Sequence, residues 1–282
     1  FLTPSMMVYV FGMDKDAVDS HNIPYTARAA FTIGAMLSIT TILWSITRVP
    51  ELPLTPAEKA HIASRPKGVA ATFKEIWDAI VEMPAAMRKL AVMSLFQWYA
   101  MAAYWGYVIY SIGRSVYQTS DPTSDGFRSA VLTNGEMAAF YNCIAFVAAF
   151  ALIPFTKRFG PAVVHAACLS LAGLGMLALP HVESKWMLFL PAIGVGLGWA
   201  SIMGNPYVIL AGSIPPERTG VYMGIFNMMI VIPMLLIAAT LPFYYKPLMG
   251  GDPRNVLTLS GILMFCAAIA VLRARDEGRA IG

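Results

Sequence analysis

Long apolar segments separated by short polar loops dominate the sequence. Complete segments lie near residues 29–47, 90–112, 135–156, 161–180, 186–212, 219–242 and 255–272, and residues 1–13 hold the end of another. A helix needs about 20 mostly apolar residues to cross a bilayer. Lipid offers the backbone no hydrogen bonds, so a spanning segment satisfies its own. The sequence therefore predicts an all-α integral membrane protein with seven complete spans and one partial span.

Composition and residue spacing argue against other broad classes. Charged residues make up 13% of the chain, whereas soluble domains carry about 25%. Lys and Arg lie in short loops between apolar segments, which is typical of membrane orientation and not of a nucleic-acid-binding face. The three cysteines and four histidines lack metal-ligand or disulfide spacing. There is no paired-carboxylate or nucleophile–base set. We therefore expect no cofactor, no metal and no enzyme activity.

The loop charges predict an orientation. If alternate loops face opposite sides, 13 of the 20 Lys and Arg fall on one side, in residues 48–89, at Lys157, Arg158 and Arg218, and after residue 272. Positive loops favour the cytoplasm. We therefore expect a multi-pass protein of the plasma membrane, for example a bacterial inner membrane, with a cytoplasmic C-terminus.

The polar region 48–89 contains an amphipathic pattern. Thr72 and Glu75 fit a capping box, and Phe73, Trp77 and Met87 belong to an apolar set at helical spacing. This pattern predicts a helix that lies on the membrane surface. A helix that rests on the bundle fits it equally well.

Residues 194–233 predict two adjacent helices that line a polar pathway. Pro206 and Pro233 lie inside apolar segments, and each removes a helix hydrogen bond. Such breaks are tolerated at membrane depth only against protein or a water-filled cavity. Gly220 and Gly224 have the spacing that permits close helix approach. Asn227 follows on the same stripe, where it would serve either packing or substrate contact.

Polar and aromatic side chains within the apolar segments are the candidate substrate ligands. Three of them form one stripe of segment 90–112, which suits a hydroxyl-rich ligand, although ordinary helix packing explains the stripe as well. The other candidates are amide side chains, which can hold a neutral solute, or residues next to Pro206 in the sequence. The candidates are Gln97, Tyr104, Tyr107, Asn142, Asn205, Tyr207 and Asn227.

Glu136 is the one carboxylate that we place within a span. Carboxylates at membrane depth are candidates for coupling or gating. Thr133 and Glu136 also fit a capping box at a helix start, and we prefer this second interpretation.

Several stretches resemble a known family. They are Thr41–Glu51, Phe96–Tyr99 with Gly113–Tyr117, and Ile209–Asn227 continuing to Pro233. Because of these stretches, the chain over residues 25–272 resembles the C-terminal portion of a major facilitator superfamily transporter. More narrowly, it resembles the sucrose-transporter and glycoside–pentoside–hexuronide:cation symporter group.

The resemblance implies a domain organisation. Residues 1–47 would hold the end of helix 5 and helix 6 of an N-terminal bundle, residues 48–89 a cytoplasmic interdomain loop with the amphipathic helix, and residues 90–282 the C-terminal six-helix bundle. The N-terminal half of the same transporter, with the charged coupling residues, would lie upstream. Arg114, within one of the matching stretches, joins Glu136 as a candidate for coupling or gating.

The resemblance also implies a function. It indicates a secondary active transporter that takes up a sugar, a disaccharide or glycoside, with a proton or another cation by alternating access. The expected partners are the sugar, the cation, the lipid bilayer and the N-terminal half, with no nucleic acid. Two alternatives stay open: a facilitator-type transporter of a non-sugar solute, and a truncated, facilitator-like structural subunit of a membrane complex.

Overall fold

The computed structural model describes residues 3–14, 17–21, 23–50, 53, 55–56, 59–60, 68–215 and 218–273. The chain divides into two units, Thr3–Glu82 and a second that begins at Met83. The described residues are almost entirely helical, with one isolated bridge between Val18 and Pro24. This confirms the all-α prediction. Outside the described residues lie 51–52, 54, 57–58 and 61–67 of the predicted interdomain loop, part of the turn before Arg218, and two arginines used in the orientation argument, Arg275 and Arg279.

The first unit contains α1 (Thr3–Tyr9), α2 (Tyr25–Arg48) and α4 (Val69–Val81). The apolar side chains of α2 are exposed on all sides, including Phe31, Trp44 and Ile46. A helix that is apolar all round suits either a core or a membrane span.

The capping box predicted at Thr72 and Glu75 is wrong. Helix α4 begins directly after Gly68, one turn earlier, and no side chain caps it. The Thr72 hydroxyl donates back to the Gly68 carbonyl at 3.3 Å instead. Met87, which we expected on this helix, lies on the next one, because a separate helix begins after Pro84.

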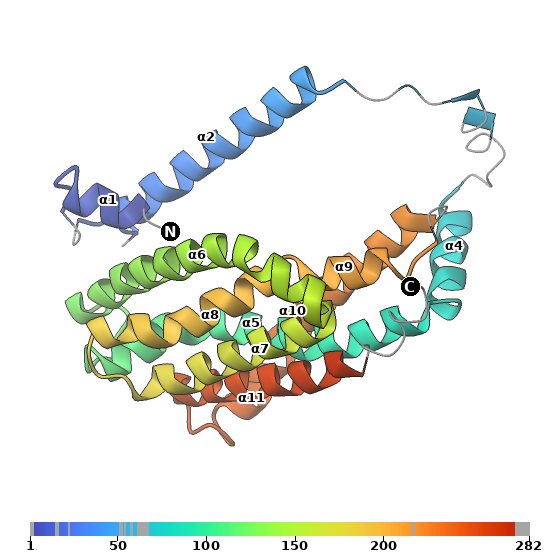
Figure 1. Ribbon diagram of the computed structural model, residues 1–282. Helices are drawn as coiled ribbons and strands as arrows, with labels where there is room; N and C mark the ends of the chain where they lie inside the picture. Colours follow the sequence, from blue (N-terminus) through green and yellow to red (C-terminus); the bar gives the residue numbers. More distant parts are fainter. Residues whose placement is uncertain are drawn as a thin grey trace. The chain divides into compact units, whose positions relative to one another are not determined.

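The second unit is a helical bundle (Figure 1). Its elements are α5 (Ala85–Ser115), α6 (Asp125–Phe159), α7 (Pro161–Ala178), α8 (Phe189–Ile202), α9 (Asn205–Ala211), α10 (Thr219–Tyr245) and α11 (Pro253–Leu272), with short 3₁₀ turns η1 (Leu179–His181) and η2 (Trp186–Leu188) between α7 and α8. Helix α5 packs against α11, α10 and α6, while α7 packs against α8 and α11, and α6 packs against α8.

Six of the described helical segments are long and apolar enough to cross a membrane. They are Tyr25–Arg48, Asp125–Phe159, Pro161–His181, Trp186–Ala211, Thr219–Tyr245 and Pro253–Leu272. Helix α5 has 31 residues but is not among them, because its Gln, Trp and Tyr side chains lower its mean hydropathy. Gln97, Trp98 and Tyr104 are buried against other helices. We predicted 90–112 as a long apolar span, but the helix there is less apolar than the other six and has polar side chains buried against protein.

Glycines bring α7 against α8 and α11, and α8 against α6. A Cβ added to Gly173 would lie 2.9 Å from the carbonyl oxygen of Gly261, and one on Gly196 would lie 2.6 Å from that of Tyr141. In the same way, a Cβ on Gly194 would collide with the carbonyl of Leu171. These glycines permit the close backbone approach that membrane helices use for packing.

The close approach predicted at Gly220 and Gly224 is wrong for the part of the chain that the structure describes. A Cβ at either position would meet no atom within 4 Å, and both residues are exposed. The spacing of small residues is present, but no neighbouring helix of the bundle faces it.

Helix α6 starts much earlier than its apolar segment. The Ser124 hydroxyl caps it by accepting from the Phe127 amide at 3.2 Å. Thr133 and Glu136 therefore lie well inside the helix, and the capping role preferred for them is wrong. At the other end, Gly160 has φ +86° and turns the chain directly into α7, a conformation that glycine adopts without strain.

Candidate functional site

A buried chain of hydrogen bonds joins five helices of the bundle. His165 on α7 bonds through Nε2 to Gln97 Oε1 on α5 at 2.9 Å, and through Nδ1 to Ser201 Oγ on α8 at 2.8 Å. Asn205 Nδ2 on α9 donates to Ser201 Oγ at 2.7 Å. Thr156 Oγ1 on α6 donates to Asn205 Oδ1 at 3.1 Å. We call these five residues the polar chain.

The chemistry of the groups gives the polar chain a direction. The Gln97 oxygen can only accept, so Nε2 of His165 carries the hydrogen. In a neutral imidazole Nδ1 then accepts, and the Ser201 hydroxyl donates to it. Every hydrogen bond thus runs from Thr156 toward Gln97. Both ring nitrogens of His165 and both polar atoms of the Asn205 amide are paired, so these buried groups avoid the penalty of an unpaired buried group.

The polar chain passes through a break between α8 and α9. Helix α8 ends at Ile202, and α9 begins at Asn205 with Pro206 in its first turn. Pro206 has no amide hydrogen, so it cannot continue the ladder to the Ile202 carbonyl. The turn at Met203 and Gly204 bonds instead to carbonyls of the preceding turn. The break therefore leaves polar backbone beside a buried amide side chain, at the proline that marks it in the sequence.

Three tryptophans on α5 and α8, the helices that carry Gln97 and Ser201, form one cluster. Trp98 and Trp105 of α5 have ring centroids 6.4 Å apart, and Trp199 of α8 lies 6.4 Å and 5.5 Å from them. Trp98 is buried, whereas Trp105 and Trp199 are half-buried. Trp199 packs edge to face against the other two indoles, and together they give this part of the bundle apolar ring surface with N–H donors.

The face of α5 that carries Gln97 continues with two unpaired hydroxyls. Ser94 and Tyr104 are each 1% exposed, and neither hydroxyl has a partner among the described residues. Buried polar groups without a protein partner commonly bond to ordered water. A polar line therefore extends along α5 on both sides of Gln97.

Of the predicted ligands, Gln97 and Asn205 belong to the polar chain, and Tyr104 shares its face of α5. Tyr107 packs instead against Tyr245, with ring centroids 5.2 Å apart, in an apolar cluster of α5, α10 and α11. Tyr207 stacks edge-on against Phe226 at 5.1 Å.

The two remaining predicted ligands make no contact with the polar chain. The Asn142 amide donates to the Ala138 carbonyl of its own helix at 2.8 Å, and Asn227 is exposed on α10. Pro233, on the same helix, is buried inside α10, which continues past it to Tyr245.

His165, Ser201 and Thr156 were not predicted. A signal was present, because a histidine inside an apolar spanning segment needs a polar partner. Ser201 lies one turn before Asn205, a spacing that allows their side chains to meet. The spacing of polar residues along the sequence does not reveal these three residues, because each stands alone in its own segment.

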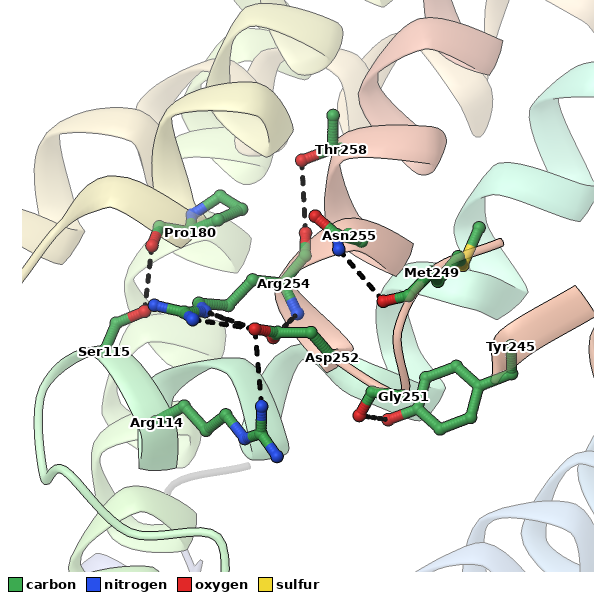
Figure 2. Close-up of polar contacts among 10 residues, drawn as sticks. All are labelled: Arg114, Ser115, Pro180, Tyr245, Met249, Gly251, Asp252, Arg254, Asn255 and Thr258. Atoms are coloured by element: carbon green, nitrogen blue, oxygen red, sulfur yellow. Dashed lines mark hydrogen bonds and ion pairs between the residues drawn. The ribbon is translucent and has the colours of Figure 1, made fainter. Parts of the chain in front are cut away.

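Arg114 belongs to a second polar cluster, at the end of α5 (Figure 2). Its Nη1 lies 3.3 Å from Asp252 Oδ2, while Arg254 Nη2 lies 2.7 Å from the same oxygen. Asp252 also caps α11 by accepting from the Arg254 amide at 2.9 Å. The hydrogen bonds from Arg254 lower the pKa of Asp252, with a smaller contribution from the charge of Arg114.

Glu136 forms an ion pair with Lys185, with 2.8 Å between Oε2 and Nζ. This pair joins the middle of α6 to the connection between η1 and η2. One turn before Glu136, the Thr133 hydroxyl bonds to the Tyr117 hydroxyl at 2.6 Å. Both polar residues therefore tie α6 to connecting segments of the bundle.

A sequence model of the Major Facilitator Superfamily matches residues 17–238, well over half of the chain. The chain belongs to the major facilitator superfamily. Proteins of this superfamily are membrane transporters, so the chain is a multi-pass membrane protein of a transporter family. The chain matches no curated protein and no solved structure.

The superfamily match covers the polar chain, the tryptophan cluster and the break at Pro206, all of which lie within residues 17–238. Asp252 and Arg254 lie beyond it, on α11. The polar chain is therefore the candidate site within the part of the bundle that matches major facilitator transporters.

Proposed function

We propose that this transporter carries a neutral, hydroxyl-rich solute, a sugar, by alternating access, and that the polar chain organises its binding site. The observation that carries the proposal is the buried, neutral and directional set of hydrogen bonds from Thr156 to Gln97, which crosses a helix break. Amide, hydroxyl and imidazole groups offer a sugar donors and acceptors without the electrostatic cost of a buried charge.

The tryptophan cluster supports the same solute class. A sugar ring has an apolar face of C–H groups and a polar rim, and indole faces pack well on such apolar surfaces. Trp105 and Trp199 are half-buried, so part of each side chain is exposed. We propose that the exposed parts of these indoles meet the solute, and that the buried Gln97 and Tyr104 support the site from behind.

Alternating access in this superfamily rocks one helix bundle against another around a site near the midplane. We propose that the second unit is the C-terminal bundle and that it works against an N-terminal half of the same transporter. Its backbone offers points of bending at Pro206, between α8 and α9, and at Pro233, inside α10. Discontinuous helices are where transporters of this type form their binding sites.

A cation gradient, of protons in the first instance, would drive uptake. His165 is the titratable member of the polar chain, and protonation there would require Ser201 to turn its hydroxyl away from Nδ1. Glu136 with Lys185, and Arg114 with Asp252, tie helices to connecting segments and would act in gating. The resemblance to sucrose and glycoside symporters supports the sugar, and the loop charges support a plasma membrane with a cytoplasmic C-terminus.

Uptake by reconstituted protein tests the proposal. The full transporter in proteoliposomes is offered labelled disaccharide, pentoside and hexuronide, with an amino acid and a lipophilic drug as non-sugar controls. Each is measured under an inward proton gradient, an inward sodium gradient and no gradient. We expect a sugar to accumulate under the proton gradient and a protonophore to abolish the accumulation.

The other outcomes separate the rival functions. Accumulation of the amino acid or the drug instead of any sugar contradicts the solute class. Equilibration of a sugar without accumulation under either gradient contradicts coupling but leaves the solute class standing. No uptake of any solute points to a structural subunit.

A further inference from the structure

We propose that a pocket at the end of α5 binds a phosphate group through Arg114. The pocket has a volume of about 220 Å³. Its lining includes the side chains or backbone of Tyr110, Arg114, Thr119, Ser120, Tyr245 and Gly251. We call it the Arg114 pocket. It lies at the end of the bundle where α5 and α10 finish and α11 begins, away from the polar chain.

The charges of the cluster formed by Arg114, Asp252 and Arg254 do not balance. Asp252 is engaged mainly by Arg254, whose Nε lies 3.1 Å from both carboxylate oxygens and whose Nη2 lies 2.7 Å from Oδ2. Arg114 reaches the same carboxylate through one nitrogen at 3.3 Å. Two guanidiniums share one carboxylate, which leaves one net positive charge, and Figure 2 shows both reaching Asp252.

Of the two guanidiniums, Arg114 is the one that lines the pocket. Its side chain is 36% exposed, and a guanidinium has five N–H donors in a fixed fork. The single long contact with Asp252 occupies one end of that fork. The remaining donors and the uncompensated charge are therefore available to an anion that enters the pocket.

The size and the donors indicate a phosphate group in preference to a larger anion. Sites for drug-sized ligands occupy roughly 300–1,000 Å³, so this pocket suits one ionic group. Arginine binds phosphate through paired N–H donors, and Ser120 belongs to the same lining. Tyr110 and Tyr245 place amphipathic rings here, as is typical at the membrane interface. The group could thus belong to a lipid headgroup or to a free phosphate compound.

Phosphate binding is measured on the full chain in a phosphate-free glycoside detergent. One arm titrates inorganic phosphate against chloride at equal ionic strength. The other titrates short-chain phosphatidylglycerol against short-chain diacylglycerol. Both arms record the dissociation constant by calorimetry and the thermal midpoint. Binding in the first arm identifies free phosphate, and binding in the second alone identifies a lipid headgroup. No preference for the phosphate compound in either arm overturns the proposal.

Three variants assign the binding to Arg114. Arg114→Gln should weaken phosphate binding at least tenfold, whereas Arg273→Gln, the same change at the opposite end of α11, should leave it unchanged. Asp252→Asn keeps a good N-cap but removes the competing carboxylate, so it should bind phosphate several-fold more tightly. A merely structural ion pair predicts the same effect for Arg114→Gln and Asp252→Asn.

Testing both Arg114→Gln and Asp252→Asn keeps the experiment decisive even if one of these variants does not fold. If Arg114→Gln does not fold, Asp252→Asn alone decides, and unchanged or weaker phosphate binding contradicts the proposal. The measurement does not involve the transported solute. A failed uptake assay and a failed phosphate titration therefore contradict different claims.

Discussion

His165 Nε2 and Gln97 Oε1 lie 2.9 Å apart in a fully buried hydrogen bond between α7 and α5. Because the amide oxygen only accepts, this bond fixes the imidazole tautomer, and the tautomer makes Nδ1 the acceptor of the Ser201 hydroxyl. The contact between α5 and α7 thus continues through Ser201 to groups on three more helices.

Loss of the imidazole should destabilise the bundle. His165→Leu leaves Gln97 and Ser201 without their partner, and an unpaired buried polar group costs about 1–3 kcal/mol. We expect a thermal midpoint in detergent several degrees below wild type. The control is His181→Leu, because His181 is exposed in η1. Equal midpoints for the two variants would show that the polar chain contributes no stability.

Two Gly→Ala substitutions should have opposite effects. Gly194→Ala would push a methyl group into the backbone of α7, whereas Gly224→Ala would meet open space. Alanine favours a helix over glycine by about 1 kcal/mol, so Gly224→Ala should be neutral or stabilising. Gly194→Ala should lower the thermal midpoint or prevent expression. Destabilisation by Gly224→Ala would instead mean that another helix packs on that stripe in the assembled transporter.

The ion pair of Glu136 and Lys185 should be a modest contact. Both side chains are partly exposed, and such pairs contribute about 0.2–1 kcal/mol. A double-mutant cycle with Glu136→Gln and Lys185→Gln isolates the pair from other contacts of Lys185, such as its approach to the Trp186 ring. A coupling energy near zero in the thermal unfolding of the four proteins would remove this pair as a candidate latch.

Acid should weaken the cap of α11. Arg254 lowers the pKa of Asp252 in the folded protein below the value of about 3.9 for an unfolded chain. The carboxylate therefore contributes stability that is fully present above about pH 5 and is lost as the pH falls through the lower, folded pKa. The thermal midpoint of wild type should fall more between pH 6 and pH 3 than that of Asp252→Asn. Parallel curves would contradict this linkage.

Features that depend on local sequence were predictable. The apolar segments gave the helices of the bundle, and the family resemblance agrees with the superfamily match over residues 17–238. Pro206 marked the break between α8 and α9, because a missing amide hydrogen acts wherever the residue lies. Length alone, however, did not distinguish α5, whose polar side chains are buried against other helices.

Features that depend on which helices meet were not predictable from one sequence. Gly194 and Gly224 have similar local contexts, and only the fold places one against α7 and leaves the other open. The cap at Ser124 was missed because α6 extends beyond its apolar segment. His165 was passed over because its partners lie on other helices, at Gln97 and Ser201.

Uptake by Ser201→Ala, compared with Ser170→Ala, tests the central claim most directly. Each substitution removes one hydroxyl, but Ser201 joins His165 to Asn205, whereas Ser170 bonds to a backbone carbonyl of its own helix. If the polar chain organises the solute site, Ser201→Ala should lower kcat/KM for sugar uptake in proteoliposomes about tenfold, from a lost buried hydrogen bond. Ser170→Ala should stay within about twofold of wild type, since its hydroxyl contributes only within α7. Wild-type uptake by Ser201→Ala, or equal losses in the two variants, would contradict the account.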